Sequence, residues 1–207
     1  MRLTRQLFAA LALLCAIQVQ AGDFGSAGYK VLNPPQPVSS GNKVEVIEFF
    51  FYECSHCDDL QGPLAAWEKQ KPKDVELQMV PVIFRETLEP MARTYYALEA
   101  MGEIKRLHHS FFDAMHRKGV DLRDEAKITD FVAKNGVDRA KFSAAYNSFS
   151  IASKLNRSNQ LVNSYRVMGT PTIAVDGKYI ITGLHPEDTV RVLDEVIKIA
   201  RKERSKH

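Results

Sequence analysis

Cysteine is scarce in this sequence. Among 207 residues there are three cysteines, at positions 15, 54 and 57. A zinc site usually needs four ligands, so the cysteines cannot form one without help from other residues. Cys54 and Cys57 stand three residues apart and form a CxxC pair. Whether this pair is a metal clip, a structural disulfide or a redox centre decides most of what the chain can do.

Long hydrophobic runs are also scarce, and the one candidate lies at the N-terminus. A basic start precedes an apolar run at 7–17, and small residues follow up to Ala21. A membrane-spanning helix needs about 20 apolar residues, so this run is short for an anchor, which is the alternative. The layout predicts a secretory signal peptide over residues 1–21, cleaved after Ala21. Export removes Cys15 and leaves the CxxC pair in a compartment where disulfides persist.

An excess of one charge and internal repetition are lacking too. The net charge is +3, and loss of Arg2 and Arg5 with the signal lowers it to +1 (3 − 2). A nearly neutral protein has no electrostatic basis for binding nucleic acid. Without repeats of solenoid-like period, a chain of 207 residues indicates one sizeable core with at most a subdomain.

The first part of the mature chain, residues 22–86, has the pattern of a βαβ unit. Residues 43–51 are an apolar, β-branched and aromatic run, typical of a strand buried on both faces. A helix is predicted to begin at or beside Cys54, and residues 74–84 have the pattern of a second strand. The proline-rich lead before residue 43 predicts an extended arm, because proline cannot serve a ladder hydrogen bond.

A helical block interrupts this unit at residues 87–165, where no convincing strand pattern occurs. Gly119 and the segment 135–138 mark helix ends. Strand patterns return in residues 166–207, with Asp176-Gly177 as a hairpin turn and a last amphipathic helix. We predict an α/β fold with an inserted all-helical subdomain.

The place of the CxxC pair at a helix start favours redox chemistry. Cys54 is expected at the exposed end of the first turn, with Cys57 one turn on along the same face, a separation compatible with a disulfide. Free backbone N–H groups and the helix dipole favour a thiolate at Cys54, and His56 can add a cationic or N–H donor. We predict that Cys54 is the nucleophile and Cys57 its buried partner.

The size of this effect predicts an oxidant. If the pKa of Cys54 fell from ~8.5 to ~4, the reduced form would gain about 3 pKa units at pH 7, or ~4 kcal/mol. For a two-electron couple this makes the potential about 90 mV more oxidising.

Two other roles for the pair stay open. A static structural disulfide is allowed by geometry, although its small loop gives little entropic stabilisation. A metal site would need histidines, and His108, His109 and His116 lack a carboxylate or cysteine at ligand spacing. We predict no metal, and we expect the three histidines at the surface or in a groove, without a catalytic role.

Two further positions bear on the site. Glu48 is a carboxylate in a buried strand, where its pKa would rise, so it could take the proton of Cys57; the alternative is a strand-edge glutamate in solvent. Pro171 stands at the mouth of a strand. A cis Thr170–Pro171 bond would free the Thr170 backbone to pair with an extended peptide; the alternative is a trans strand cap.

The combination of these features is specific. An exported chain with EFFFYECSHC at 48–57, a helical insertion and GTPT at 169–172 resembles the DsbA family of periplasmic thiol oxidases, which are thioredoxin-like proteins. The resemblance covers essentially all of the mature chain. It implies a thioredoxin fold with an inserted helical subdomain and a periplasmic location.

The resemblance also implies roles and partners. The roles are nucleophile for Cys54, partner for Cys57, thiolate stabiliser for His56, buried acid for Glu48 and cis-proline loop for Thr170-Pro171. Substrates would be reduced, unfolded secreted proteins bound through an apolar groove. A DsbB-type membrane quinone reductase would reoxidise the pair, with no cofactor in this chain.

The sequence departs from the well-studied family pattern at four positions. Ser55 replaces a proline between Cys54 and His56, and Thr170 replaces an apolar residue. Gln61 and Met79 stand where charged residues surround the buried acid. These changes predict a thinner proton-relay network and an altered tuning of the thiolate.

The leading prediction is therefore a thiol:disulfide oxidase. One alternative is a reductase or isomerase, but a DsbC-type isomerase normally brings an N-terminal dimerisation domain, and only about 20 mature residues precede the first predicted strand here. We also expect a monomer. The other alternative is a thioredoxin-like chaperone module that binds unfolded clients without thiol transfer.

Overall fold

The computed structural model describes residues 27–206. The predicted signal peptide, its cleavage after Ala21 and Cys15 lie outside the described residues. Within the part of the chain that is described, no helix combines the length and the apolar character needed to cross a membrane.

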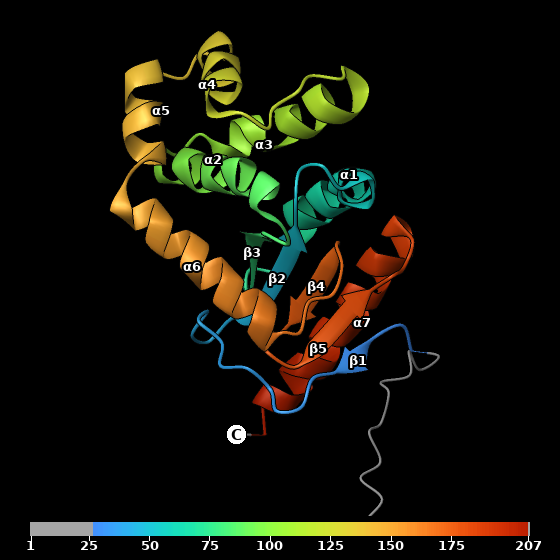
Figure 1. Cartoon of the computed structure of the whole chain (residues 1–207). Helices are drawn as coiled ribbons and strands as arrows, with labels where there is room; N and C mark the ends of the chain where they lie inside the picture. Colours follow the sequence, from blue (N-terminus) through green and yellow to red (C-terminus); the bar gives the residue numbers. More distant parts are fainter. Residues whose placement is uncertain (1–26, 207) are drawn as a thin grey trace, which may run out of the picture.

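A five-stranded mixed sheet in the order β1-β5-β4-β2-β3 forms the centre of the fold (Figure 1). Its strands are Lys30–Val31 (β1), Val44–Phe50 (β2), Val75–Pro81 (β3), Thr172–Val175 (β4) and Tyr179–Thr182 (β5). Strand β2 pairs parallel with β3 and antiparallel with β4. Because β2 is buried along its whole length, its sequence is a nearly continuous apolar run rather than an alternating one.

Helices cover both faces of this sheet. Helices α1 (Ser55–Gln70) and α7 (Pro186–Arg204) pack on one face, and α6 (Phe149–Ser164) packs on the other. Helix α1 begins at the predicted place, and its buried residues pack both against the sheet and against the helical block (Figure 1).

The helical block of the structure lies between β3 and α6, so it is shorter than the predicted block 87–165, which includes α6. It consists of Glu86–Leu88 (η1), Glu89–Ala100 (α2), Ile104–Phe112 (α3), the π-helical turn Asp113–Arg117 (η2), Glu125–Lys134 (α4) and Arg139–Tyr146 (α5). Gly119 and Gly136 follow helical segments and have positive φ, as their predicted role at helix ends requires. The predicted fold class, an α/β fold with a helical insertion, is confirmed.

The β4–β5 hairpin and the N-terminal arm hold each other. Asp176 and Gly177 have φ of 52° and 69°, as the predicted two-residue turn needs. A Cβ at Gly177 would lie 2.0 Å from the carbonyl oxygen of Gln36, so only glycine permits this approach of the arm. The prediction of a purely extended arm missed β1, which pairs with the edge of β5.

Two hydrophobic cores meet at α1. The sheet core lies between the sheet, α1 and α7 and includes Val46, Leu60, Leu64, Trp67, Ile173 and Leu193. The cap core lies within the helical block and includes Phe50, Tyr52, Cys54, Cys57, Tyr95, Phe111 and Phe112. The CxxC pair therefore belongs to the core of the inserted helices, although it starts a helix of the thioredoxin-like part.

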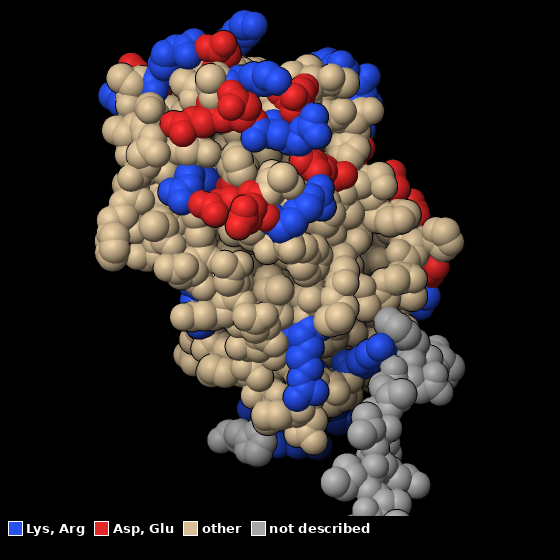
Figure 2. All heavy atoms as spheres, viewed as in Figure 1, with Lys and Arg blue, Asp and Glu red and all other residues tan. Residues whose placement is uncertain are grey.

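Charges of both signs lie side by side on the helical block. Figure 2 shows basic and acidic side chains intermixed there on the visible face. Arg93 pairs with Glu89 at 2.7 Å, and Arg106 pairs with Glu103 at 2.8 Å. The first pair is half-buried and the second is more exposed. In both pairs the opposite charges neutralise one another, so the visible part of the block presents a mixed surface rather than one of a single sign.

Candidate active site

The redox loop, residues 52–58, joins β2 to α1 and borders the cap core. Cys54 is the N-cap of α1, with extended backbone angles of φ −81° and ψ 113°. Its Sγ accepts a hydrogen bond from the Cys57 N–H at 3.2 Å, which satisfies a free amide of the first turn. Cys54 is less exposed than expected, at 7%, and Cys57 is fully buried; both are free thiols.

The surroundings of Cys54 favour its thiolate. They lower its pKa from 9.0 to about 6, chiefly through the hydrogen bond from the Cys57 side chain, while burial opposes the shift. The Thr170 side chain and the backbone N–H groups of Cys57 and His56 lower the pKa further. Because these groups stabilise negative charge on sulfur, reduced Cys54 is largely ionised at neutral pH.

Cys57 has the opposite environment. Burial raises its pKa far above that of an ordinary thiol, and the hydrogen bond to Cys54 and the charge of Glu48 raise it further. Gln61, itself buried, donates from Nε2 to the Cys57 carbonyl at 3.4 Å. Two thiols three residues apart are therefore separated into an ionised outer group and a protonated inner one.

Glu48 lies beneath the pair in the fully buried strand β2. It has no exposed surface, and both carboxylate oxygens lack a hydrogen-bond partner. Its pKa rises from 4.5 to about 8, first because of burial and then because of the charge on Cys54. Its cross-strand neighbours are the apolar residues Met79 on β3 and Ile173 on β4. Glu48 is thus a buried acid that holds its proton at neutral pH, and the solvent-facing alternative is wrong.

The Thr170–Pro171 segment lies directly beside the nucleophile. The peptide bond between the two residues is cis, so the alternative of a trans strand cap is wrong. The Thr170 carbonyl oxygen lies 3.5 Å from Cys54 Sγ and accepts a hydrogen bond from the thiol form. Met168, two residues before Thr170, is 92% exposed. The Thr170 backbone therefore adjoins the reactive sulfur, and an exposed apolar side chain lies two residues before it in the chain.

The two residues inside the CxxC motif face solvent. Ser55 is the first residue of α1 and is exposed. The His56 side chain is 80% exposed, with Nδ1 3.8 Å from Asp59 Oδ2. The backbone N–H of His56 helps to lower the pKa of Cys54, and the predicted stabilising role of the His56 side chain stays a prediction.

Two histidines of the helical block reach the redox loop, which the sequence did not predict. His108 Nδ1 lies 2.8 Å from Tyr52 Oη, and His116 Nε2 lies 2.7 Å from the Tyr52 carbonyl oxygen. The expected position at the surface or in a groove holds for His109, which is exposed, but not for His108, whose ring packs among Phe50, Tyr95 and Phe112. Burial lowers the pKa of His108 to about 3, and its Nε2 is buried without a partner.

A pattern in the sequence could have placed His108 inside. It precedes Phe111 and Phe112 by three and four residues, and side chains at this spacing share one face of a helix. Its ring contacts Phe112 and Phe50 edge-on, with centroids 5.3 Å and 5.1 Å apart.

Comparison with known proteins agrees with this geometry. The family described as "DSBA-like thioredoxin domain" matches residues 45–193. The thiol:disulfide interchange protein DsbA of Bordetella parapertussis is 36% identical over 182 residues, covering 86% of this chain and 87% of that protein. The same protein of Pseudomonas aeruginosa is 34% identical over 197 residues, covering 93% of each chain.

Solved structures give the same result. The crystal structure of Pseudomonas aeruginosa DsbA matches with a TM-score of 0.82 at 32% identity and covers 86% of this chain and 94% of that one. The structure of the oxidoreductase DsbA from Xylella fastidiosa matches with a TM-score of 0.80 at 33% identity, covering 84% of this chain and 96% of that one. Fold, cysteine pair and sequence relatives together establish that this chain belongs to the DsbA family of thiol:disulfide oxidoreductases.

Proposed function

We propose that the protein is a periplasmic oxidase that passes the Cys54–Cys57 disulfide to reduced, unfolded secreted proteins. The observation that carries this proposal is the contrast within the pair: neighbours lower the pKa of Cys54 to about 6, while burial raises that of Cys57. A stabilised Cys54 thiolate favours the reduced enzyme, and this makes the disulfide easy to donate.

The first step is the attack of a client thiolate on Cys54 Sγ in the disulfide. A bond forms between the client sulfur and Cys54, the Cys54–Cys57 bond breaks, and the electron pair leaves with Cys57. A thiolate at the buried Cys57 is unfavourable, so it takes up a proton. Glu48, with a pKa of about 8, holds one at neutral pH, and its interaction with Cys57 supports the assignment as proton donor.

The second step releases the client. A second client thiolate attacks the client sulfur of the mixed disulfide, a client disulfide forms, and Cys54 leaves as a thiolate. The low pKa of Cys54 makes it a good leaving group. Two client thiols are oxidised and the enzyme pair is reduced. On reoxidation Cys57 returns its proton, and Glu48 accepts it.

The pKa of Cys54 sets how strong an oxidant this enzyme is. A shift from 9.0 to about 6 stabilises the reduced form at pH 7 by about one pKa unit, or ~1.4 kcal/mol. This corresponds to about 30 mV, a third of the amount that a pKa of ~4 would give. We infer an oxidant that is milder than a Cys54 pKa of ~4 would produce.

Client binding and recycling are assigned by chemistry. The Thr170 backbone beside Cys54 can pair with an extended client chain, and the exposed Met168 can contact its apolar side chains. The relatives suggest a DsbB-type membrane quinone reductase as the reoxidant. We further propose export with signal cleavage after Ala21, action as a monomer, and no nucleic-acid partner.

The reduction potential tests this proposal. The mature protein is equilibrated with glutathione buffers, and the fraction of Cys54–Cys57 disulfide is measured by alkylation and mass spectrometry. We expect a value well above the roughly −270 mV of thioredoxin. A reduction potential close to that of thioredoxin would indicate a reductase. It would mean that Ser55, Gln61 and Met79 weaken the stabilisation of the Cys54 thiolate.

Two cysteine variants distinguish an oxidase from a chaperone module. Cys54→Ser should abolish disulfide transfer to a reduced peptide. Given a peptide that already contains a disulfide, Cys57→Ser should accumulate the mixed disulfide at Cys54, because the Cys54 thiolate attacks the peptide disulfide, one peptide sulfur leaves as a thiolate, and no Cys57 thiol is present to release the peptide. A chaperone would keep its suppression of client aggregation in both variants and would show no dependence of that activity on the redox state.

A further inference from the structure

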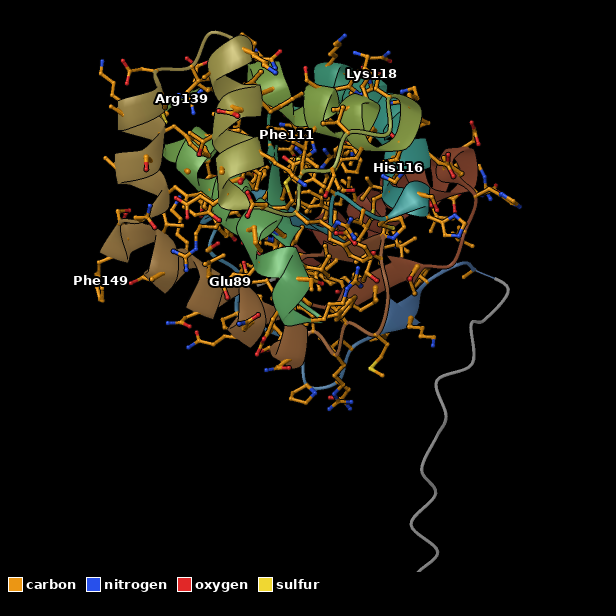
Figure 3. The ribbon with its side chains drawn as sticks, turned by 45° about the horizontal axis from the view of Figure 1, so that its top comes forward. Glu89, Phe111, His116, Lys118, Arg139 and Phe149 are labelled. Carbon is orange, nitrogen blue, oxygen red and sulfur yellow. The ribbon has the colours of Figure 1, made fainter. Side chains whose placement is uncertain are left out.

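The π-helical turn η2 contacts the redox loop on both sides of the cysteines. The contacts come from consecutive residues, His116 and Arg117, which reach Tyr52 and Asp58. Figure 3 shows His116 near the end of its helical segment, where this segment approaches α1. π-helical turns are rare and occur often at functional sites, so this geometry calls for a reason.

The first contact fixes the chain before Cys54. His116 Nε2 lies 2.7 Å from the Tyr52 carbonyl oxygen. A carbonyl can only accept a hydrogen bond, so His116 carries its proton on Nε2 and donates it. The His116 ring also stacks on Phe112, with centroids 6.1 Å apart and 22° between the planes. With His108 on the Tyr52 hydroxyl, the helical block holds both ends of this residue.

The second contact fixes the chain after Cys57. Arg117 donates to Asp58 through two nitrogens, at 2.7 Å and 3.0 Å. Its Nε donates to Asp113 at 2.9 Å, so the guanidinium bridges η2 and the first turn of α1. A planar fork with two parallel hydrogen bonds sets direction as well as distance, and Asp58 is only 10% exposed.

We propose that His116 and Arg117 are positioning residues that hold the redox loop so that the backbone N–H groups of His56 and Cys57 stay directed at Cys54 Sγ. Neither residue needs to touch the sulfur. Hydrogen bonds weaken steeply as their angle and distance deteriorate, so a small shift of Tyr52 or Asp58 reduces the stabilisation of the thiolate. The proposal rests on the oxidase function of this site, but its direct consequence is a property of the reduced protein alone.

The test is the pKa of Cys54 in reduced variants, measured by the ultraviolet absorbance of the thiolate. His116→Leu removes the donor, and we expect the pKa to rise by about 0.7 unit, a roughly fivefold fall in the ionisation constant. His116→Gln keeps an N–H that can reach the same carbonyl, and should restore the wild-type value. His109→Leu is the matched control, because it removes an exposed histidine of α3, the helix that directly precedes η2.

Arg117→Lys tests the second contact without changing the charge. Lysine keeps the attraction to Asp58 but loses the fork, so we expect a rise in the pKa of Cys54 smaller than that in His116→Leu. This variant also carries the test if His116→Leu does not fold.

The proposal is overturned if folded His116→Leu, with a wild-type circular dichroism spectrum, titrates as wild type. It is also overturned if His116→Gln shifts as far as His116→Leu, or if Arg117→Lys, as the remaining folded variant, leaves the pKa unchanged. A reductase-like potential of the wild-type pair would instead contradict the proposed function, and it would leave these pKa comparisons valid.

Discussion

The sheet core and the cap core are built from different kinds of residue. The buried residues of the sheet core, within the described part of the chain, are aliphatic side chains with Trp67 and Tyr179, and Tyr179 is the only titratable one among them. The cap core contains both cysteines of the redox pair and four tyrosines, Tyr52, Tyr95, Tyr96 and Tyr146. Burial is the first cause of the raised pKa of each of these tyrosines.

This difference shows that the thioredoxin-like sheet and the inserted helices have different roles in the redox site. The thioredoxin-like sheet supplies the β2–α1 junction, which puts Cys54 at a helix start where free amides can reach it. The inserted helices supply the low-dielectric cover that keeps Cys57 and Glu48 protonated. The insertion therefore contributes to the contrast between the two thiols, because Cys57 packs in the same hydrophobic cluster as the inserted helices.

Matched cavities in the two cores give the largest expected effect. The Phe112 ring lies 4.9 Å from that of Tyr52 and 5.3 Å from that of His108, whereas Leu193 is fully buried under the sheet. Phe112→Ala and Leu193→Ala should each lower the free energy of unfolding by about 3 kcal/mol. Only Phe112→Ala should open the cover of Cys57.

Alkylation of Cys57 in a Cys54→Ser background measures this opening. At denaturant concentrations that match global stability, we expect Phe112→Ala to react roughly tenfold faster than Leu193→Ala, because local opening is confined to the cap core. Equal rates would mean that the two cores act as one unit and would contradict the comparison.

Glu48 lies at the border of the two cores and tests what burial costs. Its unfolded carboxyl ionises near pH 4.5, whereas the folded one stays neutral until about pH 8. Because the folded pKa is raised, the folded state loses stability relative to the unfolded state as pH rises from 4.5 to 8, by ~3 kcal/mol at pH 7 at most.

Glu48→Gln cannot ionise, so it should unfold at higher urea concentration than wild type at pH 7 and at a similar one at pH 4. The same variant should slow the attack of Cys57 on a mixed disulfide, measured by rapid quenching. A variant that is less stable than wild type at pH 7 would show that the carboxylate has a stabilising partner.

Local patterns predicted the framework of the site well. The buried strand around Glu48, the helix start at Cys54 and the turn at Asp176-Gly177 each depend on a few neighbouring residues. Such features follow from hydrophobic period, capping and turn chemistry. The resemblance to the family added the Thr170-Pro171 loop, which no local pattern could place beside the cysteine.

Contacts between distant parts of the chain could not be predicted from the sequence. His108 and His116 contact Tyr52, from which they are 56 and 64 residues away in the sequence. These contacts depend on how the helical block packs against α1. The depth of the pKa shift at Cys54 could not be predicted for the same reason. Burial by the block opposes the thiolate, and a helix start considered alone does not show this.

The titration of Cys54 gives the next smaller effect and separates the outer thiol from the inner one. Its folded pKa of about 6 lies below the ordinary 9.0, so its contribution to the stability of the reduced protein is complete above pH 9. It amounts to ~1.4 kcal/mol at pH 7 and vanishes as pH falls through 6. The oxidised protein lacks this contribution, because Cys54 in a disulfide does not ionise.

Urea unfolding of both redox forms should be measured at several pH values. Between pH 6 and 9, the free energy of unfolding of the reduced form should rise relative to that of the oxidised form. The Cys54→Ser variant is the control, since it removes the titrating group. A stability difference that does not vary over this range would place the Cys54 pKa near that of a free thiol.

The smallest expected effect concerns Ser55, where this chain departs from the proline of the family pattern. Cys54 has the extended backbone that a following proline requires, and the first helical position suits proline because its N–H has no partner in the helix. The thiolate of Cys54 is stabilised by the amides of His56 and Cys57 rather than by that of Ser55. Ser55→Pro should thus raise the free energy of unfolding by about 0.5 kcal/mol and shift the pKa of Cys54 less than His116→Leu does. A larger pKa shift from Ser55→Pro would mean that the motif itself, more than the helical block, tunes the outer thiol.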